Sequence, residues 1–260
     1  MRKIAILIPC FNEEEGIGYV LDEIPRKRLA DLGYETEILV IDNNSKDRTA
    51  EVAKSKGVRV IKEIKQGKGY AIINGFNNIP KDTDIIAMID GDNSYDIKEL
   101  PRLLEPLENN FGDVIVGTRL HGRLQNSSMR SLNRWGNWLF TFLARVAYKT
   151  NVTDVCSGFF AWKRQVVDDL VNHLESDGFS IEMEMITKMA KLGYSCYSVP
   201  ISYNSRNGKS TLRPFQDGVS ILHAWVKNLG WRPKMLVDEK IDALDQTEQV
   251  NKNWLSDRSN

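Results

Sequence analysis

The sequence of 260 residues has no excess charge of either sign, because 35 Lys and Arg balance 35 Asp and Glu. This balance argues against a protein whose whole surface is built to bind nucleic acid or an anionic membrane. Cysteine is scarce as well. Cys10, Cys156 and Cys196 are far apart, and none belongs to a CxxC or Cys/His cluster. A disulfide framework and a structural zinc site are therefore disfavoured, and a reducing cytosolic compartment fits best.

Long apolar runs and the common nucleotide fingerprints are also missing. No stretch reaches the roughly 18 to 20 uninterrupted apolar residues that span a bilayer. The N-terminus has a short apolar run followed by three glutamates, which we expect to form a first strand and its exit rather than a signal peptide. GxxxxGK[ST] is absent, as is GxGxxG after this strand, so the P-loop NTPase and Rossmann dehydrogenase classes lose their main support. We expect a soluble or peripheral protein.

The first half of the chain alternates short apolar runs with helical patterns. The runs lie at 3–9, 37–42, 58–64, 84–90 and 113–119, and the helical patterns lie at 13–30, 46–56, 68–79 and 97–109. Parallel neighbours need a long return connection, and short strands buried on both faces are continuously apolar. The alternation therefore predicts an α/β sandwich with a parallel sheet and crossover helices.

The second half is less regular. Helical patterns lie at 135–148, 163–172, 180–192 and 214–229, a turn or strand at 155–164, and a strand at 194–203. From Trp231 onward the sequence is mostly polar. We expect one domain over 1–230, which includes an interfacial or acceptor segment at 119–150, and a polar tail over 231–260.

An acidic pair, Asp90-Gly91-Asp92, directly follows the apolar residues of the run at 84–89. Two carboxylates at a strand exit can approach one hard cation, and Mg²⁺ or Mn²⁺ joins such carboxylates to substrate phosphates. In parallel sheets ligands bind beyond the carboxyl ends of the strands, which is where this pair is expected. A solvated acidic turn would give the same pattern, so the pair alone does not settle the matter.

Further motifs accompany the pair in a fixed order. They are Pro9-Cys10-Phe11-Asn12-Glu13, Asp42-Asn43-Asn44-Ser45-Lys46-Asp47, Gly67-Lys68-Gly69 and Gly117-Thr118-Arg119. In order and spacing the set resembles the family 2 inverting glycosyltransferases, most closely their dolichyl- or polyprenyl-phosphate sugar synthase branch. The resemblance covers about residues 3–215. It implies the GT-A fold, a Rossmann-like three-layer α/β/α sandwich with a mostly parallel central sheet.

The resemblance also implies a nucleotide-sugar site. Its residues would be Pro9, Phe11, Glu13, Asp42, Lys68, Asp90, Gly91 and Asp92. Asp90 and Asp92 would hold a Mg²⁺ or Mn²⁺ ion together with the diphosphate. Phe11 stands where the family often has Tyr, and Asp42 keeps only the first acid of the family's D-D-G-S motif. Three alternatives stay open: Asp42 caps a helix that begins near Lys46, Phe11 belongs to the core, and Gly67–Gly69 is a simple turn.

The catalytic groups expected from the resemblance are mostly cations. A lipid phosphate acceptor is already anionic near neutral pH and needs no strong general base, but cations must position it. Arg119, Arg206 and Ser210 are the candidates, acting with Asp92. A solvated basic loop is the alternative for the two arginines.

Four further residues are expected on the sugar and acceptor side. Asp154, Ser157 and Gly158 match a family segment D-x-x-S-G-F that lines this side. Glu182 or Glu184 would contact sugar hydroxyls, serve as a base for a hydroxyl acceptor, or be a surface acid.

Charge is unevenly distributed around a possible lipid contact. The segment between Val114 and Thr153 contains no Asp or Glu, and its cations are Arg119, Arg123, Arg130, Arg134, Arg145 and Lys149. Within it, apolar and aromatic residues recur at helical spacing from Trp135 to Tyr148. A Trp-rich helix preceded by arginines is typical of a membrane interface, and a core or dimer helix is the alternative.

Together these features predict a metal-dependent inverting glycosyltransferase. It would move a hexose or N-acetylhexosamine from a UDP- or GDP-sugar to dolichyl or polyprenyl phosphate, as a peripheral protein on the cytoplasmic face of the membrane. No nucleic-acid partner is expected, and the oligomeric state is left open. The alternatives are transfer to a glycan hydroxyl, a sugar nucleotidyltransferase, and a non-catalytic nucleotide-binding scaffold.

Overall fold

The computed structural model of the chain describes residues 1–124, 131–208 and 211–233. Ser210 and all but the first three residues of the predicted tail lie outside the described residues, so those predictions stay open. Within the described part, residues Met1–Leu229 form one compact unit. None of the described helices combines the length and the apolar composition that crossing a bilayer requires.

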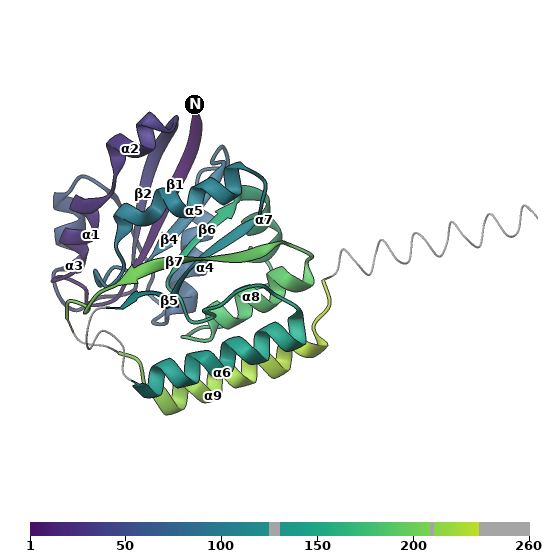
Figure 1. Ribbon diagram of the computed structural model, residues 1–260. Coiled ribbons are helices and arrows are strands. Elements are labelled where there is room, and N and C mark those ends of the chain that lie inside the picture. The colour runs from purple at the N-terminus through teal and green to yellow at the C-terminus, as the bar shows by residue number, and fades with distance from the viewer. Residues whose placement is uncertain (125–130, 209–210, 234–260) are drawn as a thin grey trace, which may run out of the picture. The chain divides into compact units, whose positions relative to one another are not determined.

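Seven strands form a single sheet in the order β3-β2-β1-β4-β6-β5-β7 (Figure 1). Their bounds are β1 (Arg2–Cys10), β2 (Tyr34–Asp42), β3 (Arg59–Lys62), β4 (Ile85–Ile89), β5 (Val114–Leu124), β6 (Phe159–Lys163) and β7 (Cys196–Tyr203). β1, β2, β3 and β4 pair in parallel, as do β5 and β7. Only β6 is antiparallel to its neighbours, β4 and β5. The predicted mostly parallel α/β architecture is confirmed.

Helices connect these strands. Their bounds are α1 (Ile17–Glu23), α2 (Arg26–Asp31), α3 (Thr49–Ser55), α4 (Lys68–Asn78), α5 (Leu100–Glu108), α6 (Ser131–Tyr148), α7 (Arg164–Val171), α8 (Ile181–Lys191) and α9 (Pro214–Gly230), and a short 3₁₀ helix, η1, spans Ile97–Glu99. The single helix expected over 13–30 is two helices. Pro25 separates them because a residue that precedes proline avoids the helical region, and Ile24 is extended, with ψ of 122°.

The sheet separates two apolar cores, as the two-residue period of a strand requires. Ala5 and Leu7 of β1 pack into one core with α4, α7 and α8, whereas Ile6 and Ile8 pack into the other with α1 and α5. The result is a three-layer α/β/α arrangement. Helices α6 and α9 run side by side and belong to the first of these layers (Figure 1).

The chain turns sharply where three of the parallel strands end. Asn12, Asn44 and Asn93 follow β1, β2 and β4 and have positive φ values of 55°, 59° and 60°. Asparagine tolerates this left-handed conformation better than most residues. The first two turns are tied together, since the Asn12 N–H donates to Ser45 Oγ (3.0 Å) and the Lys46 N–H donates to Asn12 Oδ1 (2.7 Å). These turns bring the polar strand-exit residues to one edge of the sheet.

Candidate active site

A cavity of about 680 Å³ lies at the carboxyl ends of β1, β2 and β4. Its lining comprises Pro9, Cys10, Phe11, Glu13, Asn43, Gln66, Gly67, Lys68, Ala71, Asp90, Gly91, Asp92, Asp177, Gly178, Phe179, Arg206, Thr211, Arg213, Gln216 and Asp217. Every residue expected to bind the nucleotide sugar is among them except Asp42. A cavity of this size suits a ligand as large as a nucleotide sugar.

Lys68 links two carboxylates at one side of this cavity. Its Nζ lies 2.8 Å from Asp90 Oδ1 and 2.6 Å from Glu182 Oε1. Burial disfavours the lysine charge, but the two carboxylates raise the pKa of Lys68 well above its usual value. Burial also raises the pKa of Glu182, against the attraction of Lys68. Glu182 is buried in the first turn of α8, so the surface-acid interpretation is wrong for it.

Arg206 links the other members of the predicted site. Its Nη2 lies 2.8 Å from Glu13 Oε1, and its Nη1 lies 3.4 Å from Asp92 Oδ2. Asp92 is oriented by Ser94, whose N–H (3.0 Å) and hydroxyl (2.5 Å) both donate to Asp92 Oδ1. The loop after β7 thereby brings a cation to the acidic pair, and the phosphate contact expected of Arg206 stays a prediction. The structure does not place Arg206 in a merely solvated loop.

Two polar atoms in this network lack a hydrogen-bond partner. Glu13 Oε2 and Arg206 Nε are buried and have no hydrogen-bond partner among the described residues. Burial raises the pKa of Glu13 to about 8; Arg206 opposes the rise, and Asp92 adds to it. Buried polar atoms without partners are rare in folded proteins. These two atoms are available for hydrogen bonds to a polar ligand.

The donor set fits a divalent cation that is shared with a ligand. Within the described residues, no group of three or more His, Cys, Asp or Glu side chains can hold a metal ion alone. Mg²⁺, however, is commonly bound by one or two carboxylates plus substrate phosphates. Asp90 and Asp92 both line the cavity, and they supply hard oxygen donors of this kind.

The glycines on either side of Lys68 leave room for another part of the chain. A Cβ on Gly67 would lie 2.2 Å from the Asp177 carbonyl oxygen, and a Cβ on Gly69 would lie 1.9 Å from that of Ser176. The Gly69 N–H also donates to the Asp177 carbonyl (2.9 Å). The two glycines therefore admit the chain's own 176–177 loop against the start of α4, and this packing places Asp177 and Phe179 in the cavity wall.

The residues after β2 are arranged differently from the prediction. Asp42 is buried outside the cavity lining, where it accepts from the Ser45 N–H (3.2 Å). It does not cap a helix near Lys46, because α3 begins at Thr49 and Asp47 accepts from the Thr49 N–H. Asn43 takes the place at the cavity. Its side chain accepts from the Gly67 N–H and donates to the Lys65 carbonyl, which a carboxylate could not do.

Arg119 lies behind the cavity rather than in its lining. Its Nε and Nη2 each lie 2.8 Å from an oxygen of Asp154, and Nη2 also donates to the Cys156 carbonyl. The guanidinium stacks over the ring of Tyr203. Although burial alone would raise it, the Arg119 charge holds the pKa of Asp154 below its usual value. The expectation of a phosphate contact by Arg119 is corrected, because its bidentate ion pair engages it internally.

Ser157 and Gly158 also lie outside the cavity lining and support it from behind. The Ser157 hydroxyl donates to the Gly117 carbonyl (2.6 Å), and the Gly158 N–H donates to Tyr95 Oη (2.7 Å). Gly158 lies so close to Asp90 that a Cβ there would be 2.0 Å from Asp90 Oδ2. The predicted D-x-x-S-G-F segment therefore affects the site indirectly, by fixing the position of Asp90.

Glu184 has a structural environment that excludes the predicted role as a base. Both of its oxygens accept hydrogen bonds from the backbone N–H groups of Glu175 or Ser176. Lys188 Nζ lies 2.6 Å from Glu184 Oε1, and both side chains are buried. Glu184 thus holds the loop that continues into Asp177 and Phe179 of the cavity wall.

Two groups of cavity residues were not predicted from the sequence. One is the Asp177–Phe179 loop, and the other is formed by Thr211, Arg213, Gln216 and Asp217 around the start of α9. Neither group belongs to a motif with a fixed spacing from the acidic pair. The two glycines around Lys68 were a usable signal, since paired glycines often admit a close backbone neighbour.

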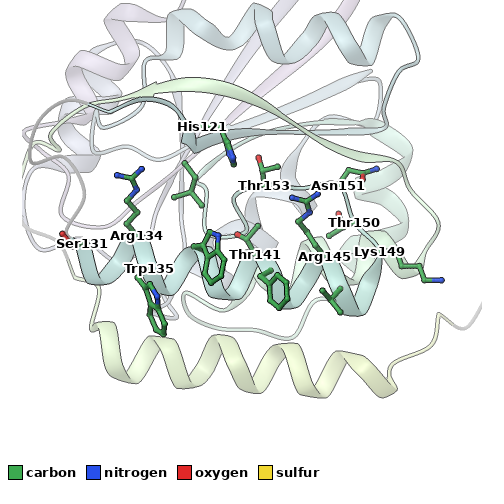
Figure 2. A pocket seen from close by; sticks show the side chains of 14 residues that line it. His121, Ser131, Arg134, Trp135, Thr141, Arg145, Lys149, Thr150, Asn151 and Thr153 are labelled. Carbon is green, nitrogen blue, oxygen red and sulfur yellow. The ribbon is translucent and has the colours of Figure 1, made fainter.

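A second cavity, of about 1060 Å³, lies along α6. Figure 2 shows Arg134 and Arg145 extending from α6 toward the segments that carry His121 and Thr153, while Trp135 points toward α9. The walls of this second cavity also include Trp138, Phe142 and Lys149. This open cavity, called the α6 groove below, combines cations with exposed aromatic rings. Both kinds of residue were noted in the sequence of this stretch.

Known proteins resemble this chain in sequence. The family model "Glycosyl transferase family 2" matches residues 5–171. A dolichyl-phosphate hexose transferase of Haloferax volcanii is 33% identical over 224 residues, which are 86% of this chain and 92% of that protein. An undecaprenyl-phosphate mannosyltransferase of Micrococcus luteus is 28% identical over 215 residues, 78% of this chain and 84% of that protein.

One longer relative and one solved structure complete the comparison. The low-salt glycan biosynthesis hexosyltransferase Agl6 of Haloferax volcanii is 33% identical over 83% of this chain, which spans only 51% of that protein's length. Glucosyl-3-phosphoglycerate synthase of Mycobacterium tuberculosis, crystallised with Mn²⁺, uridine diphosphate and glucosyl-3-phosphoglycerate, superposes with a TM-score of 0.68. It is 22% identical, and the match covers 88% of this chain and 80% of that one. At this identity the likeness shows a shared fold.

Proposed function

This chain belongs to glycosyl transferase family 2, and from that premise we propose that it moves a hexose or N-acetylhexosamine from a UDP- or GDP-sugar to dolichyl or polyprenyl phosphate. The acceptor is supported by two relatives, a dolichyl-phosphate hexose transferase and an undecaprenyl-phosphate mannosyltransferase. The donor is supported by the fold neighbour that was crystallised with uridine diphosphate.

The observation that carries the proposal is one cavity shared by the acidic pair and two cations. Asp90 and Asp92, which follow β4, face it together with Lys68 at the start of α4 and Arg206 in the loop after β7. Such a set suits a diphosphate, because phosphate oxygens accept from Arg and Lys, and carboxylates reach the phosphates through a cation.

Asp90 and Asp92 would hold the Mg²⁺ or Mn²⁺ ion. When bound, the ion supplies Lewis-acid stabilisation of the charge that develops on the leaving nucleoside diphosphate. The fold neighbour crystallised with Mn²⁺ supports this choice of cofactor. Arg206 adds a fixed positive charge beside Asp92, where the leaving diphosphate would be neutralised further.

The remaining residues of the cavity have separate parts in donor binding. Phe11 and Pro9 would frame the base, since an aromatic ring at the cavity wall can stack on it. Lys68, Asp90 and Glu182 form a largely shielded network of ion pairs that would orient the sugar hydroxyls. Ser210 is proposed as a further phosphate ligand on the loop that carries Arg206.

In this proposal the acceptor, dolichyl or polyprenyl phosphate, reaches the site from a lipid surface. The α6 groove carries Arg134, Arg145 and Lys149 beside exposed Trp135 and Trp138, a combination that suits the headgroup region of a bilayer. An anionic lipid phosphate would attack the anomeric carbon in line and invert its configuration, with no strong base required. The protein would then act as a peripheral enzyme on the cytoplasmic face.

A screen of donors and acceptors tests this function. The full chain is incubated with UDP- or GDP-linked hexoses and N-acetylhexosamines, a short polyprenyl phosphate, and Mn²⁺ or Mg²⁺. We expect a lipid-linked sugar and a nucleoside diphosphate in equal amounts from one donor class. Transfer to a soluble glycan without any lipid phosphate would contradict the acceptor.

A further inference from the structure

Asp90 lies just beyond the last residue pair of an antiparallel ladder. Strands β4 and β6 pair as far as Ile89 and Phe159, and the next two residues in that register are Asp90 and Gly158. Residues that face each other across two strands are close neighbours. A Cβ on Gly158 would lie 2.0 Å from Asp90 Oδ2, so the carboxylate packs directly on the glycine. The position of Asp90 therefore depends on what holds Gly158 where the ladder ends.

A buried tyrosine holds Gly158 at this point. The Gly158 N–H donates to Tyr95 Oη (2.7 Å), and only 3% of Tyr95 is exposed. Within residues 1–124, 131–208 and 211–233, this is the only hydrogen bond that the Tyr95 hydroxyl makes. A phenylalanine would fill the same space in the core, so the hydroxyl acts on Gly158 alone.

The ring of Tyr95 is confined by its neighbours. Its centroid lies 6.1 Å from that of Phe159 and 5.0 Å from that of Tyr203, and both pairs are edge-to-face. The Arg119 guanidinium lies 5.9 Å from the same centroid. Tyr95 and Tyr203 also form an antiparallel backbone bridge. A hydroxyl on a ring that is packed in this way has a fixed position, and it fixes the position of the Gly158 N–H in turn.

Tyr95 belongs to the loop that carries the acidic pair, three residues after Asp92. In the same loop, the N–H and the hydroxyl of Ser94 both donate to Asp92 Oδ1. One loop thus orients both carboxylates of the pair. Ser94 holds Asp92 directly, whereas Tyr95 holds Asp90 through Gly158.

The alternative interpretation is that Tyr95 is an ordinary core residue. Its ring is part of the apolar core on one face of the sheet, together with Phe159. In that case loss of the hydroxyl would lower stability, because a buried Gly158 N–H would lose its partner, and would leave ligand binding unchanged. The two interpretations therefore differ in what happens at the acidic pair.

We propose that Tyr95 is a positioning residue for the metal and diphosphate site, and that its hydroxyl acts on Asp90 through Gly158. The ion and the diphosphate in this inference rest on the proposed function. Tyr95 lies outside the lining of the donor cavity, so its effect on these ligands is indirect. Without the hydroxyl, Gly158 loses its anchor, and the Asp90 carboxylate that packs on it loses its fixed direction.

Tyr95→Phe in the full chain tests this inference, since it removes the hydroxyl and keeps the ring. The Kd for UDP and for GDP is measured by calorimetry with Mn²⁺ present, and the free energy of unfolding is measured in urea. We expect the Kd to rise about threefold to tenfold, the range for one lost hydrogen bond. Tyr34→Phe is the matched control, because Tyr34 is also buried and its hydroxyl donates to Glu108 outside the cavity lining. It should lower stability and leave the Kd unchanged.

A double-mutant cycle tests whether the effect passes through Gly158. Gly158→Ala alone should weaken nucleotide binding, and adding Tyr95→Phe to it should change the Kd by less than about twofold, because the two residues act in series. Independent effects that multiply would overturn this route. A wild-type Kd for Tyr95→Phe would assign Tyr95 to the core and overturn the inference alone. Failure of the wild type to bind either nucleotide with Mn²⁺ would overturn the proposed function, and this inference with it.

Discussion

Gly158 lies directly against the carboxylate of Asp90, so closely that a Cβ on this glycine would be 2.0 Å from Asp90 Oδ2. The glycine is held there by its N–H, which donates to the hydroxyl of Tyr95. Asp90 in turn lies 2.8 Å from Lys68. The direction in which Asp90 points is therefore fixed by a segment that does not itself line the donor cavity.

Gly158→Ala should displace the Asp90 carboxylate and weaken binding of Mn²⁺ and UDP or GDP about tenfold or more, which corresponds to at least about 1.4 kcal/mol of binding free energy. Isothermal titration calorimetry checks this. Gly136→Ala is the control, because a Cβ there meets nothing within 4 Å and alanine favours the helix. Equal nucleotide affinity in the two variants would contradict the role given to Gly158.

Lys68→Met should separate metal binding from turnover. Removing the cation beside Asp90 leaves more negative charge for a divalent ion, so Mn²⁺ affinity in the absence of nucleotide should rise several-fold. Transfer should fall about a hundredfold or more, because the network that Lys68 holds together would no longer orient the sugar. Electron paramagnetic resonance of Mn²⁺ and a transfer assay give the two readings. Exposed Lys65→Met is the control, and weaker Mn²⁺ binding in Lys68→Met would count against this account.

Asp154→Ala should lower the free energy of unfolding by about 3–5 kcal/mol, because it leaves the buried Arg119 guanidinium without its partner. Urea unfolding followed by circular dichroism measures this. Asp82→Ala, which removes an exposed pair with Lys3, should leave stability close to wild type.

The pair should also make stability depend on pH. Folding lowers the pKa of Asp154, so the contribution of Asp154 to the free energy of unfolding is present above the unfolded value of 3.8 and is lost as the pH falls below it. A variant as stable as wild type at neutral pH would refute the structural role of the pair.

Glu13 should make the metal-free protein less stable as the pH rises. Its folded pKa of about 8 exceeds the unfolded value of 4.5, so its contribution is fully present below pH 4.5 and is lost as the pH rises through 8. The free energy of unfolding of wild type should fall relative to Glu13→Gln by up to about 1.4 kcal/mol per pH unit in this window. Urea titrations from pH 5 to 9 in a chelating buffer provide the comparison, and parallel curves for the two proteins would be the opposing result.

Much of the site was predictable because it follows short buried strands. Glu13, Asp90 and Asp92 come directly after β1 and β4, and parallel strands end at a common edge of the sheet. The order of the motifs was therefore enough to predict that these side chains lie close together, and they line one cavity. The same reasoning placed Arg119 there, but Asp154, which lies in a loop distant in sequence, pairs with Arg119 behind the cavity.

The parts that could not be predicted depend on packing between distant segments. Asp177 and Phe179 reach the cavity because the 176–177 backbone packs against Gly67 and Gly69, a contact that no single motif contains. Glu182 and Glu184 look alike in the sequence, yet one faces Lys68 in the cavity wall and the other faces Lys188. Residues two positions apart on a helix point in different directions, and only the fold shows which partner each one meets.

The most direct test of the central claim is transfer from a nucleotide sugar to a short polyprenyl phosphate by the wild type and by Asp92→Asn, with Mn²⁺ present. The wild type should form a lipid-linked sugar with inverted anomeric configuration. Asp92→Asn should retain the fold and transfer the sugar at least about a hundredfold more slowly than the wild type. The reason is that the Lewis-acid contribution of the bound ion is worth several kcal/mol. Transfer by Asp92→Asn at the wild-type rate, or no lipid-linked product from any UDP- or GDP-sugar with the wild type, would contradict the account.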